Sequence, residues 1–298
     1  MFYLFIIIMI AFVYVLTRFC LLKKEIKNTT RQLHDFNVNK TAKKIDINYN
    51  DSHFEELAKE INNQIELTKQ AEAVKRSTEN ELKQAISHIS HDIRTPMTSI
   101  LGYIQFLESD EINPELKKEY IKTIKNSAGR LKILLEDFFE LSIIEQADYP
   151  LKVERVRLND LIVGSLFGFY EEFNRRKIEP EIRIPDKDIM MMIDPSAVKR
   201  VVENLVVNAI RYSTGNVAIR LEKFEASVQL RVSNTVDKLN EQDVNQMFDR
   251  FYKADQTRTG KGTGLGLPIA KSLMEKMNGS IYAKLENNQI TITCEWRL

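Results

Sequence analysis

The fold is decided by residues 86–107, which read ISHISHDIRTPMTSILGYIQFL. Apolar residues recur there at gaps of three and four positions, namely Ile86, Ile89, Ile93, Met97, Ile100, Ile104 and Leu107. At about 100° per residue these side chains fall on one narrow stripe of an α-helix. The segment therefore predicts a long amphipathic helix that buries one face.

A second apolar stripe follows after a turn. Ser109, Asp110, Asn113 and Pro114 signal the turn, and Pro114 suits the first position of a helix. Apolar residues then recur at the same spacing, namely Ile121, Ile124, Ala128, Leu131, Leu135 and Phe138. One hairpin cannot cover two such stripes. We therefore expect residues 81–148 to form an all-α hairpin that pairs with a second copy in a dimeric four-helix bundle.

The N-terminal stretch is apolar and uncharged from Met1 to Thr17. Residues 1–22 come close to the roughly 20 residues that span a bilayer as a helix. A cleaved signal peptide, the main rival, would need a basic start and a small-residue cleavage site, and neither is seen. Lys23 and Lys24 follow the span, which favours a cytoplasmic body by the positive-inside rule. We expect a single-pass membrane protein with no domain outside the cell.

Residues 23–80 are predicted to couple this anchor to the hairpin. The part up to Asp51 reads as a polar linker. Its basic cluster of Lys40, Lys43 and Lys44 is either solvated or in contact with the membrane surface. From Phe54 the apolar spacing of a helix returns, weakens at the polar Thr68, and a charged helix then runs on towards residue 85. A stripe this thin needs a partner helix, so we expect a coupling helix that weakly resembles part of a HAMP-type signal converter.

Composition excludes several classes of protein. The chain has 298 residues, and its 43 Lys and Arg against 42 Asp and Glu give a net charge of +1, which argues against nucleic acid as the main partner. Its 10 glycines and 7 prolines are too few for a collagen-like or low-complexity protein. Cys20 and Cys294 lie at opposite ends of the chain, so they predict neither a disulfide framework nor a cysteine-rich metal site.

Short strands and helices alternate from residue 149 onward. Extended segments are expected at 151–158, 178–184, 189–193, 216–224, 227–233, 280–285 and 289–297, the last two as a hairpin that turns at Asn287-Asn288. Helices are expected at 159–174, 195–212 and 270–277, the second of them capped by Asp194. The pattern predicts an α+β sandwich with helices on one face of a mixed sheet.

The first chemical motif lies on the predicted hairpin at residues 87–96, SHISHDIRTP. His91 falls almost opposite the apolar stripe, and Thr95 shares its face. Asp92 can hold the proton on one ring nitrogen of His91 and leave the other free as a nucleophile. Pro96 removes one helical hydrogen bond and loosens this turn. On helix geometry alone, a surface histidine without a function remains the alternative.

Two further motifs suit a polyphosphate. Asn204, Asn208 and Arg211 share one face of a predicted helix, where amides and a guanidinium can meet a metal-bound polyphosphate or simply form a polar face. Residues 260–266 hold four glycines just before a helix. Glycine lets backbone N–H groups approach an anion, and a helix N-terminus favours negative charge. The loop is neither a Walker loop nor a dinucleotide fingerprint, and a flexible loop is the simpler alternative.

In this order and spacing the three motifs resemble those of a bacterial sensor histidine kinase of a two-component system, over roughly residues 80–298. The resemblance implies a homodimer with a GHKL-type ATP-binding domain at residues 149–298. It also implies that His91 is autophosphorylated, that Asp92 is its acid/base neighbour, and that Thr95 orients water when the response regulator is dephosphorylated.

The same resemblance implies the residues that hold Mg²⁺ and ATP. Asn208 would ligate Mg²⁺ with Asn204 beside it, Arg211 would contact phosphate, and Tyr212 would pack near the adenine. The other implied nucleotide-binding residues belong to the lid and the glycine box, namely Phe251, Arg258, Gly262, Gly264, Leu265 and Gly266.

One stretch departs from the family pattern of Asp-X-Gly-X-Gly after a central strand. Here residues 233–237 read SNTVD, without glycines. Asn234 would then replace the aspartate that accepts a hydrogen bond from the adenine amino group. An amide oxygen can accept that bond without carrying charge. Nucleotide affinity and adenine selectivity are therefore left open.

The leading prediction is a membrane-bound kinase that autophosphorylates His91 and passes the phosphoryl group to an aspartate of a response regulator, with phosphatase activity as well. A kinase-deficient phosphatase or regulatory scaffold of the same fold is the alternative, which ATP binding would discriminate. An ATP-hydrolysing machine of the same nucleotide fold is disfavoured, because Asn204 stands at its usual catalytic glutamate position. A membrane sensor or transporter is a candidate partner.

Overall fold

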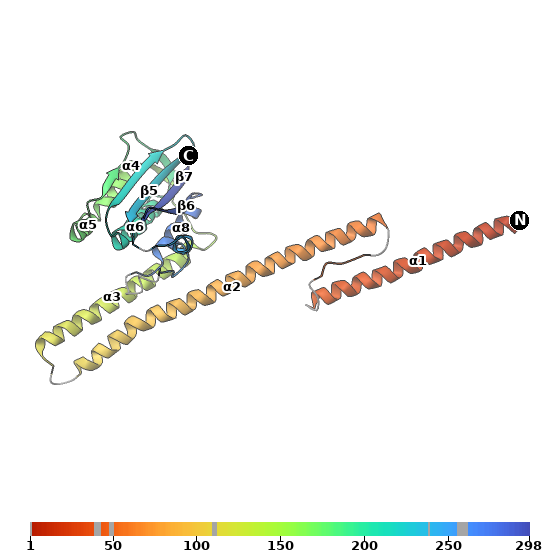
Figure 1. Ribbon diagram of the computed structural model, residues 1–298, viewed down its shortest axis with the longest axis horizontal. Helices are drawn as coiled ribbons and strands as arrows, with labels where there is room; N and C mark the ends of the chain where they lie inside the picture. The colour runs from red at the N-terminus through yellow and green to blue at the C-terminus, as the bar shows by residue number, and fades with distance from the viewer. Residues whose placement is uncertain (1, 39–42, 48–50, 109–111, 238, 255–261) are drawn as a thin grey trace. The chain divides into compact units, whose positions relative to one another are not determined.

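The computed structural model describes residues 2–38, 43–47, 51–108, 112–237, 239–254 and 262–298 (Figure 1), apart from the side chains of Glu81 and Leu82. Contacts divide the chain into two compact units, Met1–Gln84 and Ala85–Leu298. The candidate site residues all fall in the second unit.

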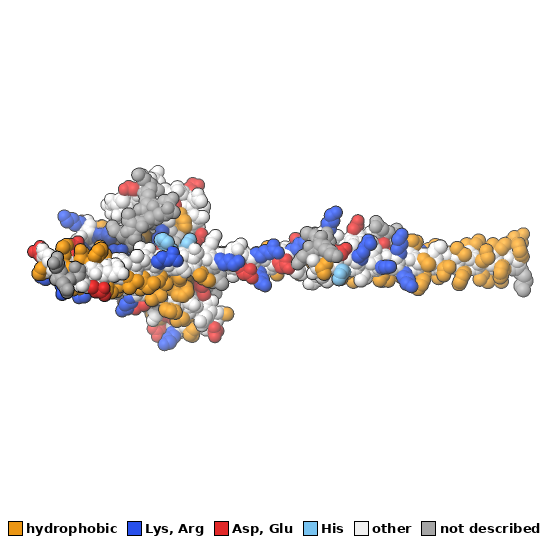
Figure 2. All heavy atoms as spheres, turned by 90° about the horizontal axis from the view of Figure 1, so that it is seen from below, with side chains coloured by type: hydrophobic (Ala, Val, Ile, Leu, Met, Phe, Trp, Pro, Cys, Tyr) orange, Lys and Arg blue, Asp and Glu red, His pale blue; other side chains and the backbone are white. Residues whose placement is uncertain are grey.

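The first unit begins with helix α1, Phe2–Asn37. Its most apolar 18-residue window has a mean hydropathy of 2.5 and no buried residue, so α1 is long and apolar enough to cross a membrane. Figure 2 shows its hydrophobic side chains crowded at the N-terminal end. Residues 23–37, expected as the first part of a polar linker, continue this helix. Residues 23–37 contain neither glycine nor proline, so nothing in the backbone stops the helix.

The segment between α1 and α2 is held by side-chain amides. Asn62 accepts from the backbone N–H of Ile45 at 2.8 Å and donates to its carbonyl at 3.0 Å. Gln32 makes the same pair of bonds to the backbone of Asp46, both at 2.9 Å. Lys44 of the predicted basic cluster pairs with Glu66 at 3.4 Å, whereas Lys40 lies outside the described residues.

Helix α2, Ser52–Leu107, runs without interruption from the predicted coupling helix into the apolar stripe of residues 86–107. Helix α3, Pro114–Ile144, starts at the predicted proline, and its N-cap Asn113 accepts from the backbone N–H of Glu115 at 3.0 Å. Residues 85–144 of these helices are called the hairpin below. Several large apolar side chains of the hairpin are exposed in the single chain, namely Ile86, Met97, Leu101, Ile104, Ile121, Ile133, Phe139 and Ile143.

The C-terminal domain, residues 149–298, is built on a five-stranded sheet of order β2-β4-β5-β7-β6. Its strands are β2 Glu181–Arg183, β4 Val217–Lys223, β5 Ser227–Thr235, β6 Ser280–Glu286 and β7 Gln289–Arg297. Strand β2 is parallel to β4, and the other pairs are antiparallel. A separate antiparallel pair joins β1 Glu154–Arg157 to β3 Met190–Ile193.

Helices cover one face of this sheet (Figure 1), and the core lies between the two layers. They are α4 Leu158–Phe167, α5 Tyr170–Arg176, α6 Pro195–Tyr212, α7 Glu241–Gln246 and α8 Gly266–Lys276. Alternate residues of β5 are buried, and Leu230, Leu205, Ile269 and Trp296 are almost fully enclosed. This architecture confirms the predicted α+β sandwich with a mixed sheet.

Three details of the C-terminal domain differ from the sequence prediction. The expected helix 159–174 is divided into α4 and α5, because Gly168 caps α4 and Phe169 leaves helical geometry. The expected strands 151–158 and 178–184 pair over only four and three residues. Helix α7 was not predicted, although the capping box between Asn240 and Asp243 is visible in the sequence.

Asp194 links α6 to the chain that enters the domain. Its side chain accepts from the backbone N–H groups of Ser196 at 2.8 Å and Ala197 at 3.0 Å, as the predicted cap requires, and also from Lys152 at 2.7 Å. The carboxylate is buried, so removing it leaves these backbone N–H groups without a hydrogen-bond acceptor and away from water.

We expect Asp194→Ala to destabilise the C-terminal domain by roughly 2–4 kcal/mol, through loss of the cap and of the Lys152 bond. Urea unfolding followed by fluorescence of the single tryptophan, the buried Trp296, measures this change. The control is Asp186→Ala at an exposed position. Equal unfolding midpoints for the two variants would contradict the capping role.

Candidate functional site

His91 stands on an exposed turn of α2, with 76% of its side chain accessible. Its Nδ1 lies 3.4 Å from Oδ1 of Asp92. The hydroxyl of Thr95 donates to the carbonyl of His91 at 3.2 Å. Pro96 has no N–H to offer the carbonyl of Asp92, so this turn lacks one helical bond. The imidazole is therefore oriented through Nδ1 and open to approach at Nε2.

The polar face of α6 carries the predicted polyphosphate-binding residues. Asn204, Asn208 and Arg211 are half-buried, whereas Leu205 and Ala209 are buried against the core. Asn204 donates to the carbonyl of Arg200 one turn earlier, at 3.0 Å. The helix thus turns its amides and a guanidinium away from the sheet.

The glycine loop meets this face of α6. A Cβ added to Gly262, whose φ is +116°, would lie 2.6 Å from Nη1 of Arg211 and 3.1 Å from the hydroxyl of Tyr212. A Cβ on Gly266, the first residue of α8, would lie 3.0 Å from Oδ1 of Asn204. The glycines therefore let the loop backbone approach α6 more closely than other residues would.

The base of the predicted lid is closed by a backbone bond. The N–H of Phe251 donates to the carbonyl of Gly264 at 3.0 Å. Both residues have positive φ, +62° and +72° respectively. Leu265 is buried beneath this turn. The ring of Phe251 packs edge-on against His88 of the hairpin, with centroids 6.4 Å apart.

Asn234 lies near the end of β5 and belongs to its buried alternation, on the side that faces the helices. Its Nδ2 donates to the carbonyl of Thr235 at 3.3 Å, and the side chain is 5% exposed. A polar group enclosed at this position needs a partner. Arg258, the remaining predicted site residue, lies outside the described residues.

Ionic contacts between the hairpin and the C-terminal domain were not predicted from the sequence. Lys253 donates to Oδ2 of Asp92. Arg200 holds Glu140 through its Nε at 2.8 and 2.9 Å, and Asp137 through Nη2 at 3.1 Å. These partners are separated by 60 residues or more, and charge alone gives no signal of such pairing.

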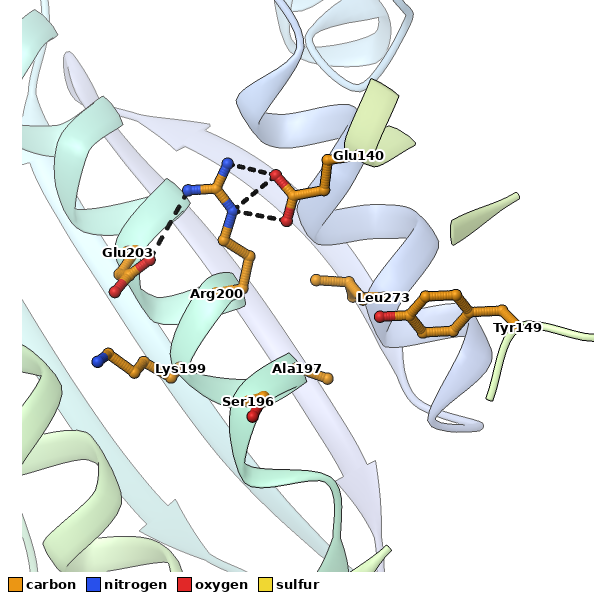
Figure 3. Close-up of a pocket in the computed structure, with 8 residues that line it drawn as sticks. All are labelled: Glu140, Tyr149, Ser196, Ala197, Lys199, Arg200, Glu203 and Leu273. Carbon is orange, nitrogen blue, oxygen red and sulfur yellow. Dashed lines mark hydrogen bonds and ion pairs between the residues drawn. The ribbon is translucent and has the colours of Figure 1, made fainter. Parts of the chain in front are cut away.

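Arg200 and Glu140 also border a surface groove of about 290 Å³ (Figure 3). Its lining comes from α3, α6, α8 and the segment after α3, namely Glu140, Tyr149, Ser196, Ala197, Lys199, Arg200, Glu203 and Leu273. Burial disfavours the charged form of Arg200, but the bond to Glu140 and the surrounding carboxylates outweigh it, so its pKa is raised. Burial, with Asp194 and Glu140 nearby, raises the pKa of Tyr149.

Family models match both the hairpin and the C-terminal domain. The family model of the His Kinase A (phospho-acceptor) domain matches residues 81–147, and that of the histidine kinase-, DNA gyrase B- and HSP90-like ATPases matches residues 193–298. The sensor histidine kinase YcbM of Bacillus subtilis is 30% identical over 82% of this chain and 81% of its own length. The chain belongs to the sensor histidine kinases. It is an ATP-dependent protein-histidine kinase of two-component signalling, as predicted.

Other relatives agree with this assignment. The sensor protein VanSC of Enterococcus gallinarum is 28% identical over 80% of this chain and 67% of its own length. Among solved structures, the histidine kinase ThkA in complex with the response regulator protein TrrA is 25% identical, with a TM-score of 0.62 over 77% of this chain and 66% of that one. The Acinetobacter baumannii histidine kinase AdeS shares the fold, with a TM-score of 0.58 at 23% identity over 70% of this chain and 97% of that one.

Proposed function

We propose that this kinase is anchored in the bacterial cell membrane by α1, phosphorylates His91 from ATP and passes the phosphoryl group to an aspartate of a response regulator. The observation that carries the proposal is the exposed imidazole of His91, oriented by Asp92 on the helix that the phosphoacceptor family matches. Lys23 and Lys24 after the apolar span favour a cytoplasmic kinase body. The exposed apolar side chains of the hairpin favour pairing with a second copy in a four-helix bundle.

The nucleotide is proposed to lie between α6, the glycine loop and the start of α8. The fit is supported by the glycines whose Cβ atoms would collide with Arg211 and Asn204, since such a backbone can approach phosphate oxygens closely. Arg211 contributes positive charge, and Tyr212 and Asn234 are the residues proposed to meet the adenine. Phe251, Gly264 and Leu265 shape the base of the lid. Arg258 is proposed to act from within the lid.

Mg²⁺ fits this site as an ion held mainly by the phosphates. No group of three or more His, Cys, Asp or Glu side chains suited to a metal occurs among the described residues. The amide oxygen of Asn208, with Asn204 beside it, is the protein ligand we propose, which suits an ion that usually keeps several waters. When bound, Mg²⁺ neutralises phosphate charge.

His91 and Asp92 have different roles in the proposed phosphoryl transfer. Asp92 accepts a hydrogen bond from Nδ1–H of His91, so the lone pair of Nε2 attacks the γ-phosphorus. The N–P bond forms as the bond to the leaving oxygen of ADP breaks. Asp92 then stabilises the positive imidazole and takes its Nδ1 proton. The site therefore acts mainly by positioning and by neutralising charge.

Thr95 is proposed to serve a phosphatase reaction of the same hairpin. Its hydroxyl lies one helical turn beyond His91 and is exposed. A hydroxyl there can orient a water molecule towards a phosphorylated aspartate of a docked regulator. ThkA has been solved in complex with a response regulator, which supports a similar docking partner here. A shift in packing of the long α2 helix is proposed to carry the stimulus, from a membrane sensor or transporter.

The proposed function is tested with the full chain in phospholipid nanodiscs, Mg²⁺ and γ-labelled ATP. We expect acid-labile, alkali-stable label on the chain, which an excess of unlabelled ATP does not remove but a cognate receiver domain does. Absence of both label and nucleotide binding, with retained dephosphorylation of a phosphorylated receiver, would favour the kinase-deficient alternative. The uncharged Asn234 is the observation behind that alternative.

Asn234→Ala should lower the affinity for ATP by about three- to tenfold, because one hydrogen bond to the adenine amino group is lost. The affinity for GTP, which lacks that amino group, should change little. Calorimetric titration with each nucleotide measures the difference. Ser233→Ala is the matched control, since Ser233 faces the other side of the sheet and bonds Thr291. Equal losses for ATP and GTP would contradict the proposed contact.

A further inference from the structure

Lys253 joins the C-terminal domain to the turn that carries His91. It follows Phe251 and Tyr252 at the start of the proposed lid. Its ammonium bonds Oδ2 of Asp92, whereas Oδ1 of the same carboxylate faces His91. Both partners are partly accessible, with 21% of the Lys253 side chain and 25% of the Asp92 side chain exposed. One oxygen of Asp92 thus faces His91, and the other accepts a hydrogen bond from Lys253 at the start of the lid.

A second group of charges joins the same two parts further along α3. Asp137 accepts from Arg200 through Oδ1 and from Thr263 of the glycine loop through Oδ2, the latter at 2.8 Å. Arg200 adds the forked bond to Glu140 (Figure 3). Just past the hairpin, Arg250 pairs at 2.7 Å with Glu145, the C-cap of α3. Carboxylates of the hairpin therefore hold both α6 and the glycine loop.

This docked arrangement leaves His91 open to solvent. Transfer needs the reacting atoms about 3–3.5 Å apart in a site from which water is excluded. With 76% of its side chain accessible, His91 is not enclosed by the part of the chain that the structure describes. The start of the lid packs one turn away, on His88. Enclosing His91 for transfer would therefore require the domain to shift on the hairpin.

We propose that Lys253 and Arg200 form an ionic clamp that holds the C-terminal domain on its own hairpin in a resting state, with Lys253 as a positioning residue that engages Asp92. The proposal rests on the proposed roles of His91 and Asp92. Partly exposed ion pairs suit a reversible clamp, because each is modest and is screened by salt. A stimulus that shifts α2 and α3 against each other would separate Arg200 from its carboxylates and free Asp92.

The clamp predicts that breaking it speeds autophosphorylation. With the full chain in nanodiscs, Lys253→Met and Arg200→Met should each raise the initial rate of His91 labelling by roughly three- to tenfold. Lys253→Arg should stay near the wild-type rate, because it keeps the charge. Lys284→Met is the matched control, since Lys284 is exposed and, among the described residues, forms its ion pair with Glu286 on its own strand. Raising the potassium chloride concentration should speed the wild type more than Lys253→Met.

A crosslinking measurement reads docking without reference to activity. Cysteines replace Glu145 and Arg250 in a chain whose exposed Cys20 is changed to Ser, and a short bismaleimide then joins them within one chain. In this background Lys253→Met or Arg200→Met should lower the crosslink yield by about the same factor by which each raises the labelling rate. Lys284→Met should leave the crosslink yield unchanged.

Two results would overturn the clamp. An unchanged crosslink yield in both variants would show that these pairs do not hold the domain. A Lys253→Met rate that falls as far as that of Asp92→Asn would show that Lys253 assists transfer rather than restrains it. If no protein is labelled on His91, the proposed function fails, and the crosslink yield still decides whether the clamp exists.

Discussion

Replacing His91 by Gln should reduce acid-labile labelling from γ-labelled ATP by at least about a hundredfold, to the background of the assay. Glutamine keeps a polar side chain of similar length on the same exposed turn, so α2 and the hairpin stay intact. It has no lone pair that can attack phosphorus as Nε2 of an oriented imidazole does. Acid lability and alkali stability identify the label as a phosphoramidate.

His88→Gln is the matched control for this experiment. His88 lies three residues earlier on the same face of α2, is also exposed, and touches Phe251 through its ring. Its variant should retain labelling within about threefold of the wild type, because no carboxylate of the described residues orients this imidazole in the way that Asp92 orients His91. Equal loss of label in both variants would indicate damage to the hairpin. Undiminished label in His91→Gln would exclude His91 as the phosphoacceptor.

The sequence predicted most of the architecture, because the decisive signals are local. The period of the apolar stripe at residues 86–107 predicted the first helix of the hairpin. Asn113 and Pro114 predicted where α3 starts, and Asp194 predicted where α6 starts. Asn287 and Asn288 both adopt positive φ, so the final hairpin turns where predicted. Each of these features depends on a few neighbouring residues, and a sequence displays such features directly.

What the sequence could not predict depends on distant partners. Lys253 and Asp92 are separated by 161 positions, and Arg200 and Asp137 by 63. With 43 basic and 42 acidic residues, the chain offers many possible pairs, and only the packing of the domain against the hairpin selects these. The extension of α1 to Asn37 was not predicted for another reason, because a polar composition does not mark the end of a helix that no glycine or proline stops.

Replacing Gly264 by Ala should lower the affinity for ATP by at least about tenfold. Its φ of +72° costs an alanine roughly 1–2 kcal/mol. The new Cβ would also lie 2.9 Å from the carbonyl carbon and Cα of Phe251, and 3.1 Å from the carbonyl oxygen of Tyr252. These are backbone atoms, so no flexible side chain can move aside. The strain must break the bond between Phe251 N–H and the Gly264 carbonyl that closes the base of the lid.

Gly164→Ala separates this effect from any general effect of adding a methyl group. Gly164 lies in α4 of the same domain, and nothing stands within 4 Å of the Cβ position, so alanine should stabilise the helix by roughly 0.5–1 kcal/mol and leave ATP affinity unchanged. Titration with ATP and thermal unfolding are measured for both variants. If Gly264→Ala lowers the melting temperature but binds ATP as the wild type does, the loop is only structural. If affinity falls while the remaining domain unfolds near its normal temperature, the glycine loop holds the nucleotide.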